Sequence, residues 1–274
     1  SLMPAAIALA ISACGGEGGP RPPSASAAAA ADGDFINSGP ISAFGSVFIN
    51  GIEYDTHHAE ILMDGAPRLE DDLRVGMIVK VTGTVNADGV TGIARKIEFT
   101  DNVQGALGRV DAAARTLVVL GQTVVTDAGT VFDGAPLSRL APGNIVEVSG
   151  LVDSAGIIHA THIDLKAPFA APGDVQEVKG VVANLDDKDR TFTVQGLRVH
   201  YAGADLSALG KDLTNGMTVE VQGAEGKDTG GALLATRVAR FAIGLRARET
   251  RGVVLALDGL VTAFESSTDF AVAG

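Results

Sequence analysis

The histidines His159 and His162, in the segment HATH, are the first residues whose type and spacing could do chemistry. Two imidazole nitrogens are ordinary ligands for zinc and other transition metals. The segment is predicted to be a strand, however, and residues three apart on a strand point to opposite faces. Without a bulge between them, the two rings could not share an ion. Comparison of the repeats places His162 at an exposed polar position, so a surface role is favoured, and His159 is kept as a ligand candidate.

His57 and His58 form a second candidate pair, in a segment predicted to be a connecting turn. No histidine recurs at the same position in another repeat. The repeat architecture therefore requires none of them, and any site here would be peculiar to one repeat.

Three aspartates in LDDKDRTF resemble an oxygen cluster for Ca²⁺: Asp186, Asp187 and Asp189. They lack the spacing and the closing Glu of a calcium loop. The parallel stretch VDAAARTL makes the same turn with Asp111 alone. A solvated hairpin turn is therefore the favoured interpretation.

The sequence carries no set of residues typical of nucleophilic catalysis or phosphate binding. No Ser, His and acid set recurs, and neither a phosphate loop nor a GxSxG elbow is present. An enzyme would need a pocket between repeats, and this stays the third hypothesis. We therefore predict no catalytic, cofactor or metal residues, and no cofactor.

The single cysteine, Cys14, follows a short apolar run from Leu2 to Ala13. Such a run is too short to span a bilayer but suits the hydrophobic region of a signal peptide. Ile11–Cys14 resembles the lipobox of bacterial lipoproteins, in which the cysteine is acylated. No basic residue precedes the run, so residues 1–14 are predicted to be a truncated lipoprotein signal peptide. Acyl chains on Cys14 would anchor the protein to a membrane.

Residues 15–38 are rich in Gly, Pro, Ser and Ala and are predicted to be a disordered tether. The residue after the cysteine is Gly15 and not Asp, which in Gram-negative lipoproteins implies no retention at the inner membrane. We therefore expect a cell-envelope location, at the outer membrane, facing the periplasm or the cell surface.

The rest of the chain must position any functional residue, and it is repetitive. The pattern LxxGxxVxVxG occurs at residues 73–83, 140–150 and 213–223. Within it, valines alternate with polar residues, which is typical of strands with one buried face. The closing glycines Gly83, Gly150 and Gly223 fall on the buried side, where a missing side chain suits a β-bulge.

The fold class is predicted to be all-β: tandem small OB-like β-barrels of about five strands each, three complete and a truncated fourth. The repeats are expected at residues 39–102, 103–172 and 173–245. Residues 246–274 are expected to be a linker and the truncated start of a fourth repeat, poorly ordered or loosely appended.

Composition excludes several partners. The formal net charge is -12 and aromatic residues make up 4% of the chain, so nucleic acid is not expected as a partner. One cysteine cannot form an internal disulfide.

The repeat body resembles a bacterial family of uncharacterised repeat domains found in predicted lipoproteins and secreted proteins. The resemblance is carried by the openings from Gly105 to Asp111 and from Gly180 to Asp186, the LGQTV run, the LxxGxxVxVxG core and the AxxI closings. It implies tandem small β-barrels on a cell envelope and no activity.

The leading hypothesis is a lipid-anchored envelope protein with a structural or interaction role and no catalysis. The membrane is its expected partner through the N-terminal lipid, and an envelope or extracellular protein or polysaccharide is a candidate partner. The alternative is a lipoprotein that binds an oligosaccharide, peptide or ion on one barrel face.

Overall fold

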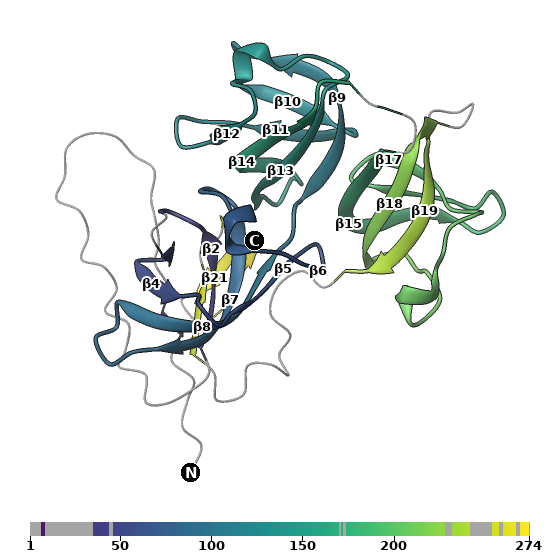
Figure 1. Cartoon of the computed structure of the whole chain (residues 1–274). Coiled ribbons are helices and arrows are strands. Elements are labelled where there is room, and N and C mark those ends of the chain that lie inside the picture. Colours follow the sequence, from purple (N-terminus) through teal and green to yellow (C-terminus); the bar gives the residue numbers. More distant parts are fainter. Residues whose placement is uncertain are drawn as a thin grey trace. The chain divides into compact units, whose positions relative to one another are not determined.

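The computed structural model describes residues 7–8, 35–43, 46–169, 171, 174–227, 232–241, 254–257, 260–266 and 269–273 (Figure 1). It divides into two compact units, Ser1–Thr100 with Leu245–Gly259 and Asp101–Gly244 with Leu260–Gly274. Cys14 and residues 15–34 of the predicted tether lie outside the described residues. Residues 35–38 belong to a strand and are largely buried, so the prediction of a disordered tether is wrong for them.

The described residues are almost all in strands or turns, so the all-β prediction is confirmed. The other elements are three short 3-10 segments, η1 (Glu70–Asp72), η2 (Leu137–Arg139) and η3 (Ser207–Leu209). Within the described part of the chain, no helix is long and apolar enough to cross a membrane.

The first repeat lies in the first unit. Its strands are β2 (Phe35–Pro40), β3 (Val47–Ile49), β4 (Ile52–Asp55), β5 (Glu60–Met63), β6 (Ala66–Pro67), β7 (Ile78–Val85) and β8 (Thr91–Phe99). The sheet order is β1-β20-β2-β7-β8-β4-β3, so two strands from outside the repeat lie beyond β2: β20 (Val254–Leu257) and β1 (Ile7–Ala8).

The strands of the second repeat form a closed circuit. Its strands are β9 (Val103–Asp111), β10 (Thr116–Val119), β11 (Gln122–Val125), β12 (Val131–Asp133), β13 (Ile145–Val152) and β14 (Ile158–Ala167). Pairing runs β9-β10-β11-β14-β13 and back to β9, which gives a closed circuit of five strands.

The third repeat has the same circuit. Its strands are β15 (Val175–Asp186), β16 (Thr191–Val194), β17 (Leu197–His200), β18 (Thr218–Lys227) and β19 (Leu233–Arg240). They pair in the order β15-β16-β17-β19-β18 and back to β15.

The second and third repeats are not separate bodies. β9 pairs antiparallel with β15, and this pairing joins the two circuits into one sheet of eleven strands. Their apolar side chains also form a single buried cluster. The prediction of discrete barrels therefore needs correction, because these repeats continue one sheet, as successive turns of a β-solenoid do. The physical reason is that the first strand of a repeat has a free edge, which a neighbouring strand covers.

The three motif glycines lie at β-bulges, as predicted. The strand register shifts between Thr82 and Gly83, between Ser149 and Gly150, and between Gln222 and Gly223. A Cβ on Gly83 would lie 2.0 Å from the carbonyl oxygen of Ile93, and one on Gly150 would lie 2.4 Å from that of His159. Glycine is therefore required by the close approach of the neighbouring backbone.

The C-terminal segment forms β21 (Leu260–Ser266) and β22 (Asp269–Ala273), which pair antiparallel in a sheet of their own. The second and third repeats also begin with a strand and its hairpin partner. Among the described strands, neither pairs with a strand of another repeat.

Candidate functional site

The junction of the second and third repeats is built from the first strands of both. In the β9–β15 ladder, Val103 lies opposite Val178 and Gln104 lies opposite Glu177. Both valines are fully buried. The segment before β9 is held on both sides, because Asn102 donates its backbone N–H to Val148 and accepts one from Lys179.

A buried ammonium group lies at this junction. Lys179 bonds through Nζ to a carboxylate oxygen of Asp101 and to one of Glu177, and the exposed fractions of these three side chains are 4%, 2% and 8%. Nε2 of Gln222 donates to the other oxygen of Glu177 at 2.9 Å. The ring of Phe241 lies 5.8 Å from Nζ, measured to its centroid, within range of a cation–π contact.

Burial of charges is costly, and it is tolerated only when each charge has a partner of good geometry. Asp101, Lys179 and Glu177, called the junction triad below, meet this condition, and they join the segment that leads into β9 to β15 of the third repeat. The triad therefore stabilises this junction, because removal of one partner while the others stay buried would leave a charge unpaired.

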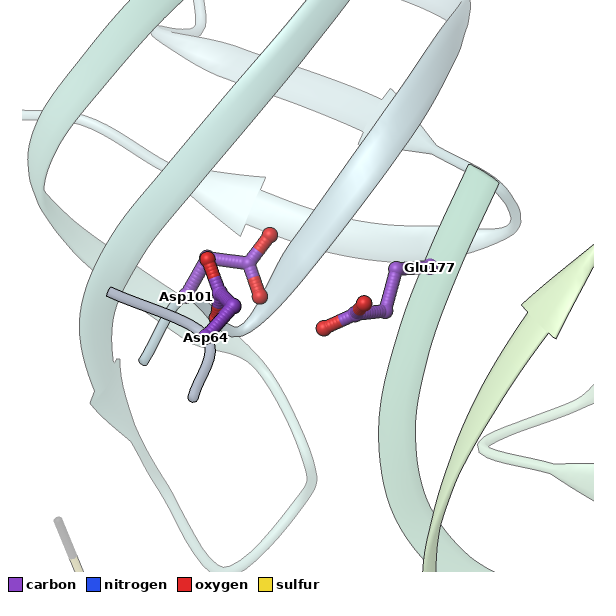
Figure 2. A group of neighbouring side chains, drawn as sticks. All are labelled: Asp64, Asp101 and Glu177. Carbon is purple, nitrogen blue, oxygen red and sulfur yellow. The ribbon is translucent and has the colours of Figure 1, made fainter. Parts of the chain in front are cut away.

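Figure 2 shows the carboxylates of Asp101 and Glu177, together with Asp64. Three carboxylates are a plausible ligand set for a hard cation by type. Asp64 belongs to the first unit, however, and Lys179 already bonds to the other two carboxylates. We therefore assign the triad a structural role and no metal.

Sequence reasoning missed the junction triad. A signal was present in VQEVKG, where Glu177 and Lys179 stand two residues apart and so lie on one face of a strand. Asp101 carried no signal, because its partner Lys179 is 78 positions away.

A second candidate site is a groove of about 600 Å³ on the first repeat. Three of its lining side chains are the carboxylates Glu53, Asp55 and Glu70. The other lining residues are Ser46, Thr56, His57, Asn86, Thr91, Gly92 and Ile93, so neither Lys nor Arg is among the described residues that line it.

Hydrogen bonds order one wall of this groove. The hydroxyl of Thr56 donates to Oε2 of Glu70 at 2.5 Å, which ties the η1 segment to the end of β4. Oδ1 of Asp55 accepts the backbone N–H of His57 at 2.9 Å. The wall is therefore pre-arranged, with carboxylate oxygens as its main polar groups.

His57 and His58 are exposed, in the turn where they were predicted. Their rings meet edge to face, with centroids 5.2 Å apart, and His57 lines the groove. Within the described residues, no cluster of three potential metal ligands includes a histidine.

His159 and His162 differ in burial. His159 is exposed and lies 3.1 Å from Asp153, measured from Nε2 to Oδ2. This hydrogen bond is the main cause that lowers the pKa of Asp153 below its usual range. The structure does not bring the two histidines together at one ligand site.

The predicted exposure of His162 is wrong, because its ring is fully buried. Its Nε2 lies 3.1 Å from Oδ2 of Asp133, which is on β12. This short strand pairs with β14, the strand that carries His162. Lys96 and Arg237 occupy the same position in the other repeats and reach solvent with longer side chains, whereas the short imidazole stays under Asp133.

The aspartates of LDDKDRTF form a turn, as expected. Oδ1 of Asp186 accepts the backbone N–H groups of Lys188 and Asp189 at 2.9 and 3.0 Å. This is the local bonding of a hairpin connection.

The strand circuits, the shared bulges and the joined sheet define the class of this protein: a tandem-repeat all-β protein. The chain belongs to the family described as "Domain of unknown function (DUF5666)", which matches residues 38–98, 105–164 and 179–239. The three matches agree with the prediction of three tandem repeats. No curated protein matches the chain.

Proposed function

We propose that this protein is a lipid-anchored envelope protein without catalytic activity, whose tandem repeats serve as a stiff spacer and interaction module. The observation that carries this proposal is the junction of the second and third repeats. There, one sheet, one apolar cluster and the junction triad join two repeats into one body. A module that keeps its shape suits a role in holding partners at a fixed separation.

The strand order also supports a finer description of each repeat. In the second repeat β9 pairs with β10 and β13, and β14 lies between β11 and β13; in the third repeat β15 pairs with β16 and β18, and β19 lies between β17 and β18. This is the order of a small five-stranded OB-like barrel. We propose that each repeat is such a barrel, joined to its neighbour through its first strand.

The anchor is proposed from Ile11–Cys14. Expression of the complete gene in a bacterium with an alkyne fatty-acid probe should label the protein, and Cys14→Ser should abolish the label. An unlabelled parent protein would refute the anchor. Fractionation of the same cells would place the labelled protein in the outer or the inner membrane.

Stiffness is tested separately with two nitroxide labels. We would place them at the exposed positions Arg109→Cys and Arg198→Cys, one in each joined repeat, in a Cys14→Ser background. Pulsed electron–electron resonance should give one narrow distance distribution. A broad distribution would overturn the spacer role. The same label pair with Lys179→Met added is the matched control and should broaden the distribution.

The acidic groove of the first repeat favours a second candidate function, the binding of a divalent cation. Its described lining offers three carboxylates and neither Lys nor Arg. Calorimetric titration of the protein with CaCl₂ should show saturable binding that Glu53→Gln with Asp55→Asn weakens at least tenfold. Glu60→Gln, an exposed acid outside the groove, is the control. Equal binding by both variants would exclude the groove.

A further inference from the structure

The outer edge of β2 holds a strand that comes from far along the chain. β20 pairs with β2 in parallel, with Phe35 opposite Val254 and Ser38 opposite Leu257. Both strands belong to the first unit. The opposite edge of β2 pairs with β7 of the same repeat.

The second and third repeats use the same edge. When the repeats are aligned on their opening glycines Gly39, Gly105 and Gly180, Asn37 corresponds to Val103 and to Val178. These two valines lie opposite each other in the β9–β15 ladder. In all three repeats, then, the beginning of the first strand has one edge inside its own repeat and the other edge covered by a strand from outside it.

The covering strands are also equivalent to one another. Gly259 aligns with Gly180, because GLVTAF continues from it as GVVANL does from Gly180. Val254–Leu257 therefore corresponds to residues 175–178, the beginning of β15. Both contacts join first-strand beginnings, antiparallel in one case and parallel in the other.

We propose that the outer edge of β2, Phe35–Ser38, is a strand-acceptor site whose partner is the beginning of the first strand of another repeat. In this chain the fourth repeat supplies that strand. A second copy of the chain could supply the same segment, so the edge is also a surface for association between copies. This inference does not rest on the proposed anchor or spacer role.

The chemistry of the contact fits this occupant. The paired segment is VLAL, with no charge to desolvate, and strand addition draws its affinity from main-chain hydrogen bonds. Ala256 is half-buried and packs against the apolar cluster of the first repeat. The edge of β2 therefore binds an apolar strand through main-chain hydrogen bonds and through the packing of at least one side chain.

The test displaces β20 from the edge of β2 and supplies the same segment as a separate peptide. In the full chain, Leu255→Pro removes a backbone donor from β20 and disfavours a strand there. A fluorescein-labelled peptide of residues 252–258 should then bind at least tenfold more tightly than it binds the unaltered chain, by fluorescence anisotropy. The same peptide with Leu255→Pro is the matched control and should not bind. Ala256→Pro is the second variant, should the first not fold.

The position of the bound peptide is tested by disulfide formation. The Leu255→Pro chain, with Cys14→Ser, would carry a cysteine through Ile36→Cys, the register partner of Leu255. A peptide with cysteine at the position of Leu255 should crosslink to it and not to a control chain with Val181→Cys, an exposed site on β15. The proposal would be overturned by absent binding, by equal binding of both peptides, or by equal crosslinking at both sites. None of these outcomes would bear on acylation of Cys14.

Discussion

The first repeat and the two joined repeats share a sequence pattern, yet they close the circle of strands differently. In the joined repeats, β9 pairs with β10 and β15 pairs with β16, so a backbone ladder completes each circuit. In the described residues of the first repeat, β2 and β3 have no such ladder. β2 has six residues and ends at Pro40, whereas β9 has nine and β15 has twelve.

Side chains take the place of the ladder in the first repeat. Nδ2 of Asn37, on β2, donates to the carbonyl oxygen of Ile49 and to the hydroxyl of Tyr54, both at 3.1 Å. Asn50 donates to Oδ1 of Asn37 at 2.6 Å and to the carbonyl of Ser38 at 3.0 Å. A proline at the strand end cannot donate to a ladder. The difference teaches that the repeat pattern specifies the strands, while single residues decide how the circuit is closed.

The largest effect is expected from Lys179→Met, which breaks the junction between the joined repeats. Loss of one partner leaves two carboxylates buried without their cation, and this typically costs about 3–5 kcal/mol. Urea unfolding followed by circular dichroism should show the loss. Lys80→Met is the control, since Lys80 and its partner Glu98 are both partly exposed, and should cost about 0–1 kcal/mol.

A further variant separates charge from packing at the junction. With Asp101→Asn and Glu177→Gln added to Lys179→Met, no buried charge remains, and most of the lost stability should return. A Lys179→Met protein as stable as its parent would contradict the structural role of the triad.

The next largest loss of stability should be equal in the first repeat and in the joined repeats, because all three repeats share the bulge. Gly83→Ala and Gly150→Ala would each press a Cβ against a backbone carbonyl that cannot move aside freely. Such overpacking costs about 1–3 kcal/mol. Thermal unfolding would measure it, with Gly108→Ala as the control, because a Cβ there has its nearest neighbour at 3.7 Å. A loss in only one repeat would mean that the bulge is not a common requirement.

These bulge glycines also show what the sequence can predict. The alternation along β7 and the placement of Gly83 and Gly150 on the buried side follow from local spacing alone, and the structure confirms both. In β13, however, Glu147 and Ser149 are buried as well, so the predicted solvent-facing side is wrong for that strand. The β9–β15 ladder and the bond between Asp101 and Lys179 depend on residues far apart in sequence, which no local pattern reports.

The candidate histidines show the same limit. His57 was correctly placed in a turn, because turn position is a local property. The groove that it lines also depends on Glu70 and on Asn86, which the fold brings near it from separate connections. The burial of His162 depends on Asp133 of another strand, and the sequence-based prediction of exposure was therefore wrong.

A smaller effect is expected from Asn37→Ala, which removes the side-chain closure peculiar to the first repeat. The carbonyl of Ile49 and the hydroxyl of Tyr54 would lose a buried donor, at a cost of about 1–3 kcal/mol. Burial raises the pKa of Tyr54 well above its usual range, so its hydroxyl stays protonated. Ser42→Ala, which removes an exposed hydrogen bond to Phe48, is the control for the unfolding measurement. Equal losses in both variants would show that Asn37 does not close the circuit.

The smallest effect concerns His159, which stands where the third repeat has Leu234. The hydrogen bond from His159 lowers the pKa of Asp153, and the backbone N–H groups of Ile157 and Ala155 lower it further. A carboxyl whose pKa is lower in the folded chain stabilises the fold above its ordinary pKa, and this contribution is lost as the pH falls through the folded value. His159→Leu should therefore raise the pKa of Asp153 toward, but not to, its ordinary value, because both backbone donors remain. A carbon-13 NMR titration of the Asp153 carboxyl would measure the shift, and His57→Leu, on the first repeat, should leave it unchanged. An identical Asp153 titration in His159→Leu and the parent would mean that His159, like Leu234, is only a surface residue.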